Sequence, residues 1–121
     1  MTADEALNLL ASTFTEERPT ASMADLRAEL LTSPDAFVWR GERSAVFLRL
    51  EETSTGERVC VAAPAAGDLG EILDRATADV ETFARENGCT QIRIQAGREG
   101  WAKALAPFGY EMTAILLRKL L

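Results

Sequence analysis

The chain has 121 residues, of which 47% are hydrophobic and 26% charged, and its formal net charge is −6. This length predicts a single domain over residues 1–121 with one hydrophobic core, and the sequence has no apolar run long enough to span a membrane. The acidic balance argues against nucleic acid as a partner. Because the first residues lack the basic start of a signal peptide, we expect a cytoplasmic protein.

Two residue types bear directly on chemistry. Histidine is absent, which removes the imidazole metal ligand and every Ser-His or Cys-His nucleophile arrangement. Cys60 and Cys89 lack the spacing of a metal or redox motif, so we expect reduced thiols and no metal site.

The charge is unevenly distributed along the chain. Residues 1–88 carry 8 basic and 17 acidic groups, a net charge of −9, whereas residues 89–121 carry 5 basic and 2 acidic groups, a net charge of +3. That basic third could favour a phosphate or an acidic protein, or be a solvated surface.

The first half of the chain predicts two helices followed by three strands. Thr2 and Glu5 form a possible capping box for a helix from about Ala3 to Phe14. A second helix is expected to begin at Ser22 and to end at Ser33-Pro34. Alternating apolar residues and glycine-containing turns then predict an antiparallel meander. Its strands are Ala36–Arg40, Ser44–Glu52 and Arg58–Ala63.

The centre of the chain predicts a parallel strand-helix-strand unit. Strand Val59–Ala63 is followed by a turn at Pro64–Gly67, a helix over Asp68–Asn87 and a strand over Thr90–Ala96. Two strands joined by a long helix should be parallel neighbours. Apolar residues at helical spacing define the core face of the helix. They are Leu69, Ile72, Leu73, Ala76, Val80, Phe83 and Ala84.

Signals at both ends of this helix define its length. Asp68 is expected to cap its start, with Glu71 as the capping-box partner, and Asn87-Gly88 should end it. Beyond it, the sequence predicts a short helix around Trp101. The apolar segment Tyr110–Leu120 predicts a strand buried on both faces.

The order of these elements resembles the fold of the GNAT superfamily of N-acetyltransferases. The most specific stretches are Phe83–Cys89 leading into Ile92–Ile94, and Ala104–Glu111. The resemblance implies an α/β (α+β) fold. Its mixed, largely antiparallel, six-strand-type sheet would be flanked by helices in the order α-α-β-β-β-α-β-α-β. The usual first and last strands have no counterpart, so this would be a short member.

The resemblance also implies a place for acetyl-CoA, at the end of the third strand and the start of the long helix. The residues that match this cofactor site are Val61, Ala62, Ala63, Gly67, Leu69 and Gly70. An anion would bind there to backbone N–H groups. The segment departs from the family pattern because it is short and lacks the usual Arg or Gln. Asp68 would also occupy N–H groups that a diphosphate needs.

Acid and base residues of the family are not matched. The strand that would carry a glutamate base holds no carboxylate, and Leu105 stands where an acidic tyrosine is expected. Glu57 and Tyr110 are possible displaced substitutes, or else a turn carboxylate and an edge aromatic. We therefore assign no catalytic residue, and the protein could be an enzyme or not.

The segment Gly97–Trp101 is similar to one in short GNAT-like proteins of phages and prophages. Arg98 and Lys103, with the open end of the sheet, could form a partner-binding surface. The alternative is that Trp101 belongs to the core and Arg98 is solvated.

The sequence thus favours a GNAT-like protein with a degenerate acetyl-CoA site. It would act in binding or assembly, as a phage structural or accessory protein in the host cytoplasm or virion. We expect a protein partner or a second copy to bind through Tyr110–Leu121, because an apolar edge strand invites pairing. The alternative is an acetyl-CoA-dependent N-acetyltransferase for a small-molecule or protein amine. A third hypothesis is a sensor of a small ligand.

Overall fold

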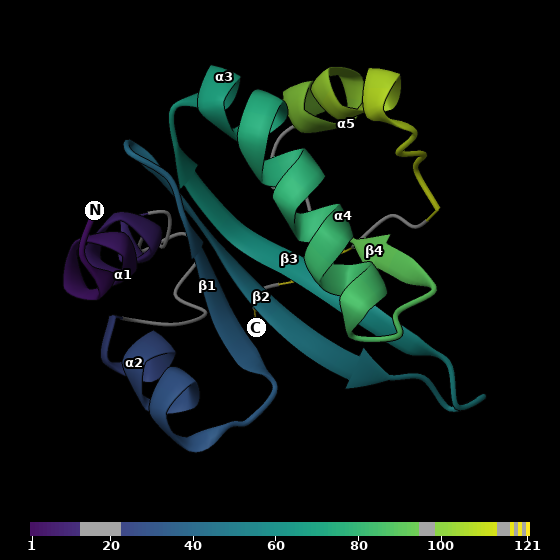
Figure 1. The fold of residues 1–121 in the computed structure, drawn as a ribbon, viewed down its shortest axis with the longest axis horizontal. Coiled ribbons are helices and arrows are strands. Elements are labelled where there is room, and N and C mark those ends of the chain that lie inside the picture. The colour runs from purple at the N-terminus through teal and green to yellow at the C-terminus, as the bar shows by residue number, and fades with distance from the viewer. Residues whose placement is uncertain (13–22, 95–98, 114–116, 118, 120) are drawn as a thin grey trace.

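A four-stranded sheet with helices on both faces forms the centre of the protein (Figure 1). The structure is a computed structural model, and it describes residues 1–12, 23–94, 99–113, 117, 119 and 121. In the described chain the strands lie in the order β1-β2-β3-β4. Their bounds are β1 Ala36–Arg40, β2 Ser44–Glu52, β3 Arg58–Gly67 and β4 Gln91–Arg93.

The pairing of the strands confirms the predicted meander and crossover. β1 with β2 and β2 with β3 are antiparallel, whereas β3 and β4 are parallel. The predicted strand Tyr110–Leu120 is wrong for the part of it that the structure describes. Residues 110–113, 117 and 119 have no strand structure, and the other residues of the segment lie outside the description. Its predicted burial is also wrong, because Met112 is 70% and Leu117 88% exposed.

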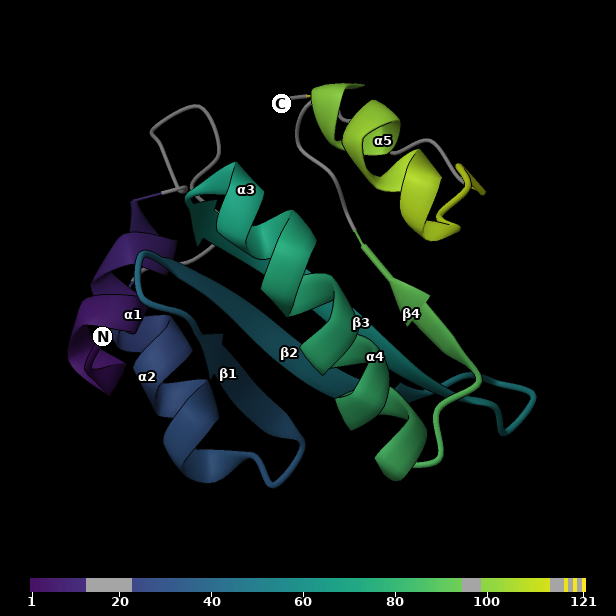
Figure 2. The ribbon, with the colours of Figure 1, turned by 45° about the horizontal axis from the view of Figure 1, so that its top comes forward.

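Helices cover the two faces of the sheet separately (Figure 2). Helices α1 (Ala3–Ala11) and α2 (Met23–Thr32) pack on one face. A continuous helix lies on the other face, made of α3 (Leu69–Glu71), the π-helical η1 (Ile72–Ala76) and α4 (Thr77–Glu86). It is followed after β4 by α5 (Glu99–Leu105), the predicted helix around Trp101, and by the 3₁₀ turn η2 (Ala106–Phe108). Among the described helices, none combines the length and apolar character that crossing a membrane requires.

Alternation along β2 supplies both halves of the core. Val46, Leu48 and Leu50 pack under the long helix, whereas Ala45 and Phe47 pack against α1 and α2. These five residues therefore alternate between the two core clusters, as the period of two of a β-strand requires.

The long helix buries four of its seven predicted core residues, whereas Leu73 and Phe83 are half-buried and Leu69 is exposed. Its fully buried apolar residues are Ile72, Ala76, Val80 and Ala84. These residues are four apart, which is more than the 3.6 residues of an α-helical turn. The π-helical turn, which is wider, accommodates this spacing. In it the Thr77 N–H bonds to the Ile72 carbonyl. Leu69 was predicted to lie on this face, but it is 46% exposed because it precedes the turn that reaches the sheet.

The predicted caps are largely confirmed. Thr2 and Glu5 form the capping box of α1. Gly88 ends α4 with φ of 74°, and the N–H of Cys89 bonds to the carbonyl of Ala84 at 2.9 Å. The predicted end of α1 at Phe14 and the predicted start of α2 at Ser22 lie outside the described residues.

Strand β3 is longer than predicted. Pro64–Gly67 was expected to be a turn, but it continues the strand, and Ala66 and Gly67 pair with Ala45 and Ser44 of β2. A bulge makes this possible. Between the pairs Val46↔Ala65 and Leu48↔Ala62, β2 has one residue and β3 has two, Ala63 and Pro64. Proline has no N–H to donate to a ladder and is tolerated at such a bulge.

Candidate functional site

Strand β3 extends well beyond its parallel neighbour β4. Their last pair is Val61↔Arg93, and the next residue, Ile94, no longer belongs to a strand. β3 continues from Ala62 to Gly67, so no strand pairs with this edge in the part of the chain that is described. Three predicted cofactor-binding residues, Val61, Ala62 and Ala63, lie where the two strands separate. An unpaired edge offers backbone N–H and C=O groups to a ligand.

The passage from β3 into the long helix is fixed by β2. Gly67 has φ of 117°, and a Cβ there would lie 2.2 Å from the carbonyl oxygen of Arg43. The Ser44 hydroxyl accepts a hydrogen bond from the Asp68 N–H at 3.1 Å and lies 3.2 Å from the carbonyl oxygen of Asp68, to which it donates. Gly67, Leu69 and Gly70, the other predicted site residues, are exposed around this turn.

Asp68 caps the helix as predicted. Its Oδ1 accepts a hydrogen bond from the Glu71 N–H at 2.9 Å. The N–H of Ile72 donates to the Asp68 carbonyl at 3.0 Å. The structure therefore confirms that a carboxylate already occupies part of this helix N-terminus.

Glu71 has a role that the sequence analysis missed. Instead of completing the capping box, its buried carboxylate accepts hydrogen bonds of 3.0 Å from the N–H groups of Glu42 and Arg43. The hydroxyl of Ser44 and these N–H groups hold the pKa of Glu71 below its ordinary range. The residue in the sequence that could have indicated this contact is Gly41, because a Cβ at that position would lie 2.3 Å from Oε1 of Glu71.

A shallow hollow of about 400 Å³ opens beside this helix start. Its lining is Glu42, Arg43, Asp68, Gly70, Glu71, Asp74 and Arg75. Four of these side chains are acidic and two are basic. Both basic groups face carboxylates, since Arg43 lies 3.7 Å from Asp68 and Arg75 lies 3.8 Å from Glu71. The hollow is therefore negatively charged overall.

The structure separates the two substitute acid–base candidates. Glu57 precedes β3, at the end remote from the long helix's N-terminus, and its carboxylate accepts bonds from the side chains of Thr90 and Gln91. Tyr110 is half-buried, and its pKa is raised by burial and by the nearby Glu81 and Cys60. Its hydroxyl thus remains protonated at neutral pH. Leu105, at the position matching the family's tyrosine, is buried in the core.

The remaining candidates are the potential metal ligands, including the two cysteines, and the residues around Trp101. Cys60 is buried and Cys89 half-buried, and both thiols are free. Within the described ranges, no cluster of three or more potential ligands is placed to hold a metal ion. Trp101 packs against the core under the long helix, as the alternative for that residue predicted. Lys103 is exposed on α5, whereas Arg98 lies outside the described residues.

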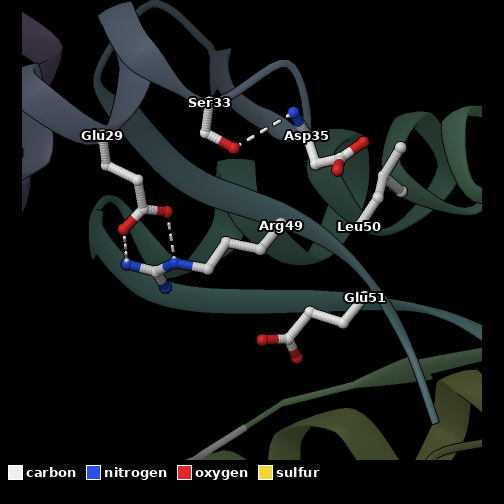
Figure 3. Close-up of a pocket in the computed structure, with 6 residues that line it drawn as sticks. All are labelled: Glu29, Ser33, Asp35, Arg49, Leu50 and Glu51. Carbon is white, nitrogen blue, oxygen red and sulfur yellow. Dashed lines mark hydrogen bonds and ion pairs between the residues drawn. The ribbon is translucent and has the colours of Figure 1, made fainter.

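A second hollow, of about 350 Å³, lies on the opposite face of the sheet beside α2 (Figure 3). Arg49 points across it toward Glu29, with bonds of 2.6 and 3.0 Å to the two carboxylate oxygens. The guanidinium also donates to the carbonyl of Ala63 at 2.9 Å and lies 4.6 Å from the ring centre of Phe47. Arg49 thus satisfies a backbone group at the β3 bulge, a role that sequence reasoning did not identify.

No family profile matches the sequence, and no curated protein matches it either. Solved structures do match. An acetyltransferase of Trypanosoma brucei is 18% identical with a TM-score of 0.65, and the match covers 95% of this chain and 89% of that one. A transcriptional regulator of Bacillus halodurans is 13% identical with a TM-score of 0.69, covering 100% and 96%.

A third match is the glucosamine-6-phosphate N-acetyltransferase of Arabidopsis thaliana, 11% identical with a TM-score of 0.63, covering 94% and 87%. The likeness at these identities is one of fold. The chain is thus a mixed α/β domain with the GNAT fold, as the resemblance predicted. Its sheet has four strands in the described residues instead of the five in the predicted element order, since no strand forms in the described part of Tyr110–Leu120.

Proposed function

We propose that this protein is an N-acyltransferase that binds the thioester arm of an acyl donor, such as acetyl-CoA, along the carboxyl half of β3. The observation that carries the proposal is the edge of β3 beyond the Val61↔Arg93 pair, with which no strand pairs in the described chain. The acetyltransferases among the solved structures with this fold support the same class of reaction. The sequence alone favours a role in binding or assembly over catalysis, whereas the proposal made here places catalysis first.

The free edge suits a pantetheine arm for two reasons. The arm carries amide groups, and amides can bond to an open strand edge as an added strand does. The side chains along this stretch are small and uncharged, which leaves room beside the backbone. They are Ala62, Ala63, Pro64, Ala65 and Ala66.

The transfer itself needs positioning and two proton movements. The amine nitrogen forms a C–N bond to the acyl carbon as the C–S bond breaks, and the amine gives its proton to solvent. The thiolate leaving group takes a proton, for which we propose the hydroxyl of Tyr110, whose neighbours include Cys60 of β3. Holding donor and amine together can supply much of the remaining acceleration.

The test is to incubate the protein with acetyl-CoA or S-acetylpantetheine and a panel of amines, and to measure thiol release and amide formation by mass spectrometry. Y110F should lower kcat by about 10²-fold or less and leave KM nearly unchanged. E57Q is the matched control, and its activity should equal that of the unaltered protein. If neither donor binds and no amide forms, the proposal is wrong.

Assembly is the second candidate, and one observation favours it. Met112, Leu117 and Leu121 are 70%, 88% and 113% exposed, and β4 pairs only with β3 in the described chain. Exposed large apolar side chains often mark contacts between proteins. We propose that a second copy or a protein partner binds this C-terminal segment, in the cytoplasm or, for a phage-encoded protein, in the virion. For a second copy, light scattering should show a dimer that the M112E/L117E variant abolishes, and a monomer at high concentration would contradict self-association.

A further inference from the structure

The start of the long helix holds negative charge where an acyl-CoA would present its diphosphate. Given the proposed acyl transfer, we infer that the donor is recognised through its acylated pantetheine arm alone and that a diphosphate contributes no affinity. Three features of the structure carry this inference: occupied N–H groups, fixed carboxylates and a neutral strand edge.

The first feature is the occupancy of the helix N-terminus. A phosphate binds such a terminus through first-turn N–H groups that have no partner within the helix. The Glu71 N–H is such a group and already donates to the Asp68 side chain at 2.9 Å, whereas the Ile72 N–H makes the first bond within the helix, to the Asp68 carbonyl. A diphosphate would have to displace a carboxylate from its hydrogen bond.

The second feature is that the negatively charged carboxylate of Glu71 is held in a fixed position. The Glu71 side chain is only 4% exposed, and the N–H groups of Glu42 and Arg43 hold its carboxylate. Gly41 packs directly against this carboxylate. Because its pKa is lowered, Glu71 is ionised at neutral pH.

The nearby cations do not offset this charge. Arg43 and Arg75 are the basic residues of the hollow, and each lies within 4.0 Å of a carboxylate, at 3.7 and 3.8 Å. The lining carries four acidic and two basic side chains, which leaves a net charge of −2. A doubly charged anion at this place is therefore repelled.

The third feature is the contrast with β3. From Ala62 to Ala66 the strand is free of charge, and its outer edge is unpaired in the described chain. A neutral diamide arm meets no repulsion there. The pantetheine arm of a donor would thus lie along a neutral strand edge, whereas its diphosphate would lie beside the negatively charged start of the helix.

Calorimetry with acetyl-CoA and S-acetylpantetheine tests the inference directly. We expect the two dissociation constants to agree within about threefold, or the smaller donor to bind more tightly. Raising the salt concentration should tighten binding of acetyl-CoA, because salt screens repulsion, and should leave S-acetylpantetheine unaffected. Acetyl-CoA binding tenfold or more tightly than S-acetylpantetheine would overturn the inference while upholding the proposed function.

Substitutions locate the effect. D68S keeps a hydroxyl that can cap the helix but removes the charge, so it should tighten acetyl-CoA binding by about fivefold or more and leave S-acetylpantetheine unchanged. E86Q, at the far end of the same helix, is the matched control and should change neither. Unchanged acetyl-CoA binding in D68S would overturn the inference. Failure of both donors to bind the unaltered protein would overturn the proposed function and the inference with it.

Discussion

The carboxylate of Glu71 accepts a hydrogen bond of 3.0 Å from the backbone N–H of Arg43, in the hairpin that joins β1 to β2. This bond and its counterpart from Glu42 join the first turn of the long helix to the sheet. We predict that E71Q lowers the melting temperature by roughly 5 °C or more, because an amide cannot accept both bonds as a carboxylate does. D74N, a change of the same kind in the same hollow, is the control and should have little effect.

The lowered pKa of Glu71 gives this contact a defined pH dependence. A carboxylate that ionises more readily in the folded protein adds stability above its unfolded pKa and loses it as pH falls through the folded pKa. The difference in stability between the unaltered protein and E71Q should therefore be full at pH 7 and shrink below about pH 4. Urea unfolding between pH 3 and 7 measures it. A difference that is constant across this range would contradict the prediction.

Gly41 is the second half of the same contact. A Cβ at this position would lie 2.3 Å from Oε1 of Glu71 and 2.7 Å from the ring of Trp39. We predict that G41A destabilises the fold by about 1–3 kcal/mol, the usual cost of adding a methyl to a filled site. G100A is the matched control, because an added Cβ there meets no described atom within 4 Å outside its own helix. Equal unfolding free energies of G41A and the unaltered protein would show that the hairpin can shift.

The elements of the fold were predictable because their signals are local. Thr2 with Glu5, and Asn87 with Gly88, define helix ends within a few residues, and alternation along β2 defines its two faces. The site was less predictable because its contacts join distant residues. Glu71 bonds to N–H groups 28 and 29 residues earlier in the chain, and no local pattern reveals that pairing.

Two errors have specific physical causes. Pro64 suggests a turn when it is read locally, but a bulge opposite Phe47 of β2 allows the strand to continue through it. The alternation of Tyr110–Leu120 suggests a buried strand, yet burial depends on a neighbour that the sequence does not name. The exposure of Met112 and Leu117 shows that this neighbour is missing from the described chain.

Arg49 provides a prediction about β3. Its guanidinium joins Glu29 to the Ala63 carbonyl at the bulge, and it is 30% exposed, so we expect R49M to cost about 1–2 kcal/mol. Amide hydrogen exchange should also quicken at Ala62–Ala66 more than in α4. E51Q lies on the same strand and lines the same hollow, and should change stability by less than about 0.5 kcal/mol. Exchange that is unchanged along β3 would show that Arg49 does not hold the bulge.

The raised pKa of the Cys60 thiol predicts that the folded protein loses stability in alkali. Burial, with a smaller effect of Cys89, raises the pKa of this thiol from 9.0 to about 11. The folded protein holds the proton more tightly, so stability is full below pH 9 and is lost as pH rises toward 11, by about 2 kcal/mol. C60A should flatten this decline in urea unfolding under reducing conditions. C89A should keep most of it, because burial is the larger cause, and Y110F separates the phenol, whose pKa is also raised. An equal decline in C60A and the unaltered protein would assign the effect to another group.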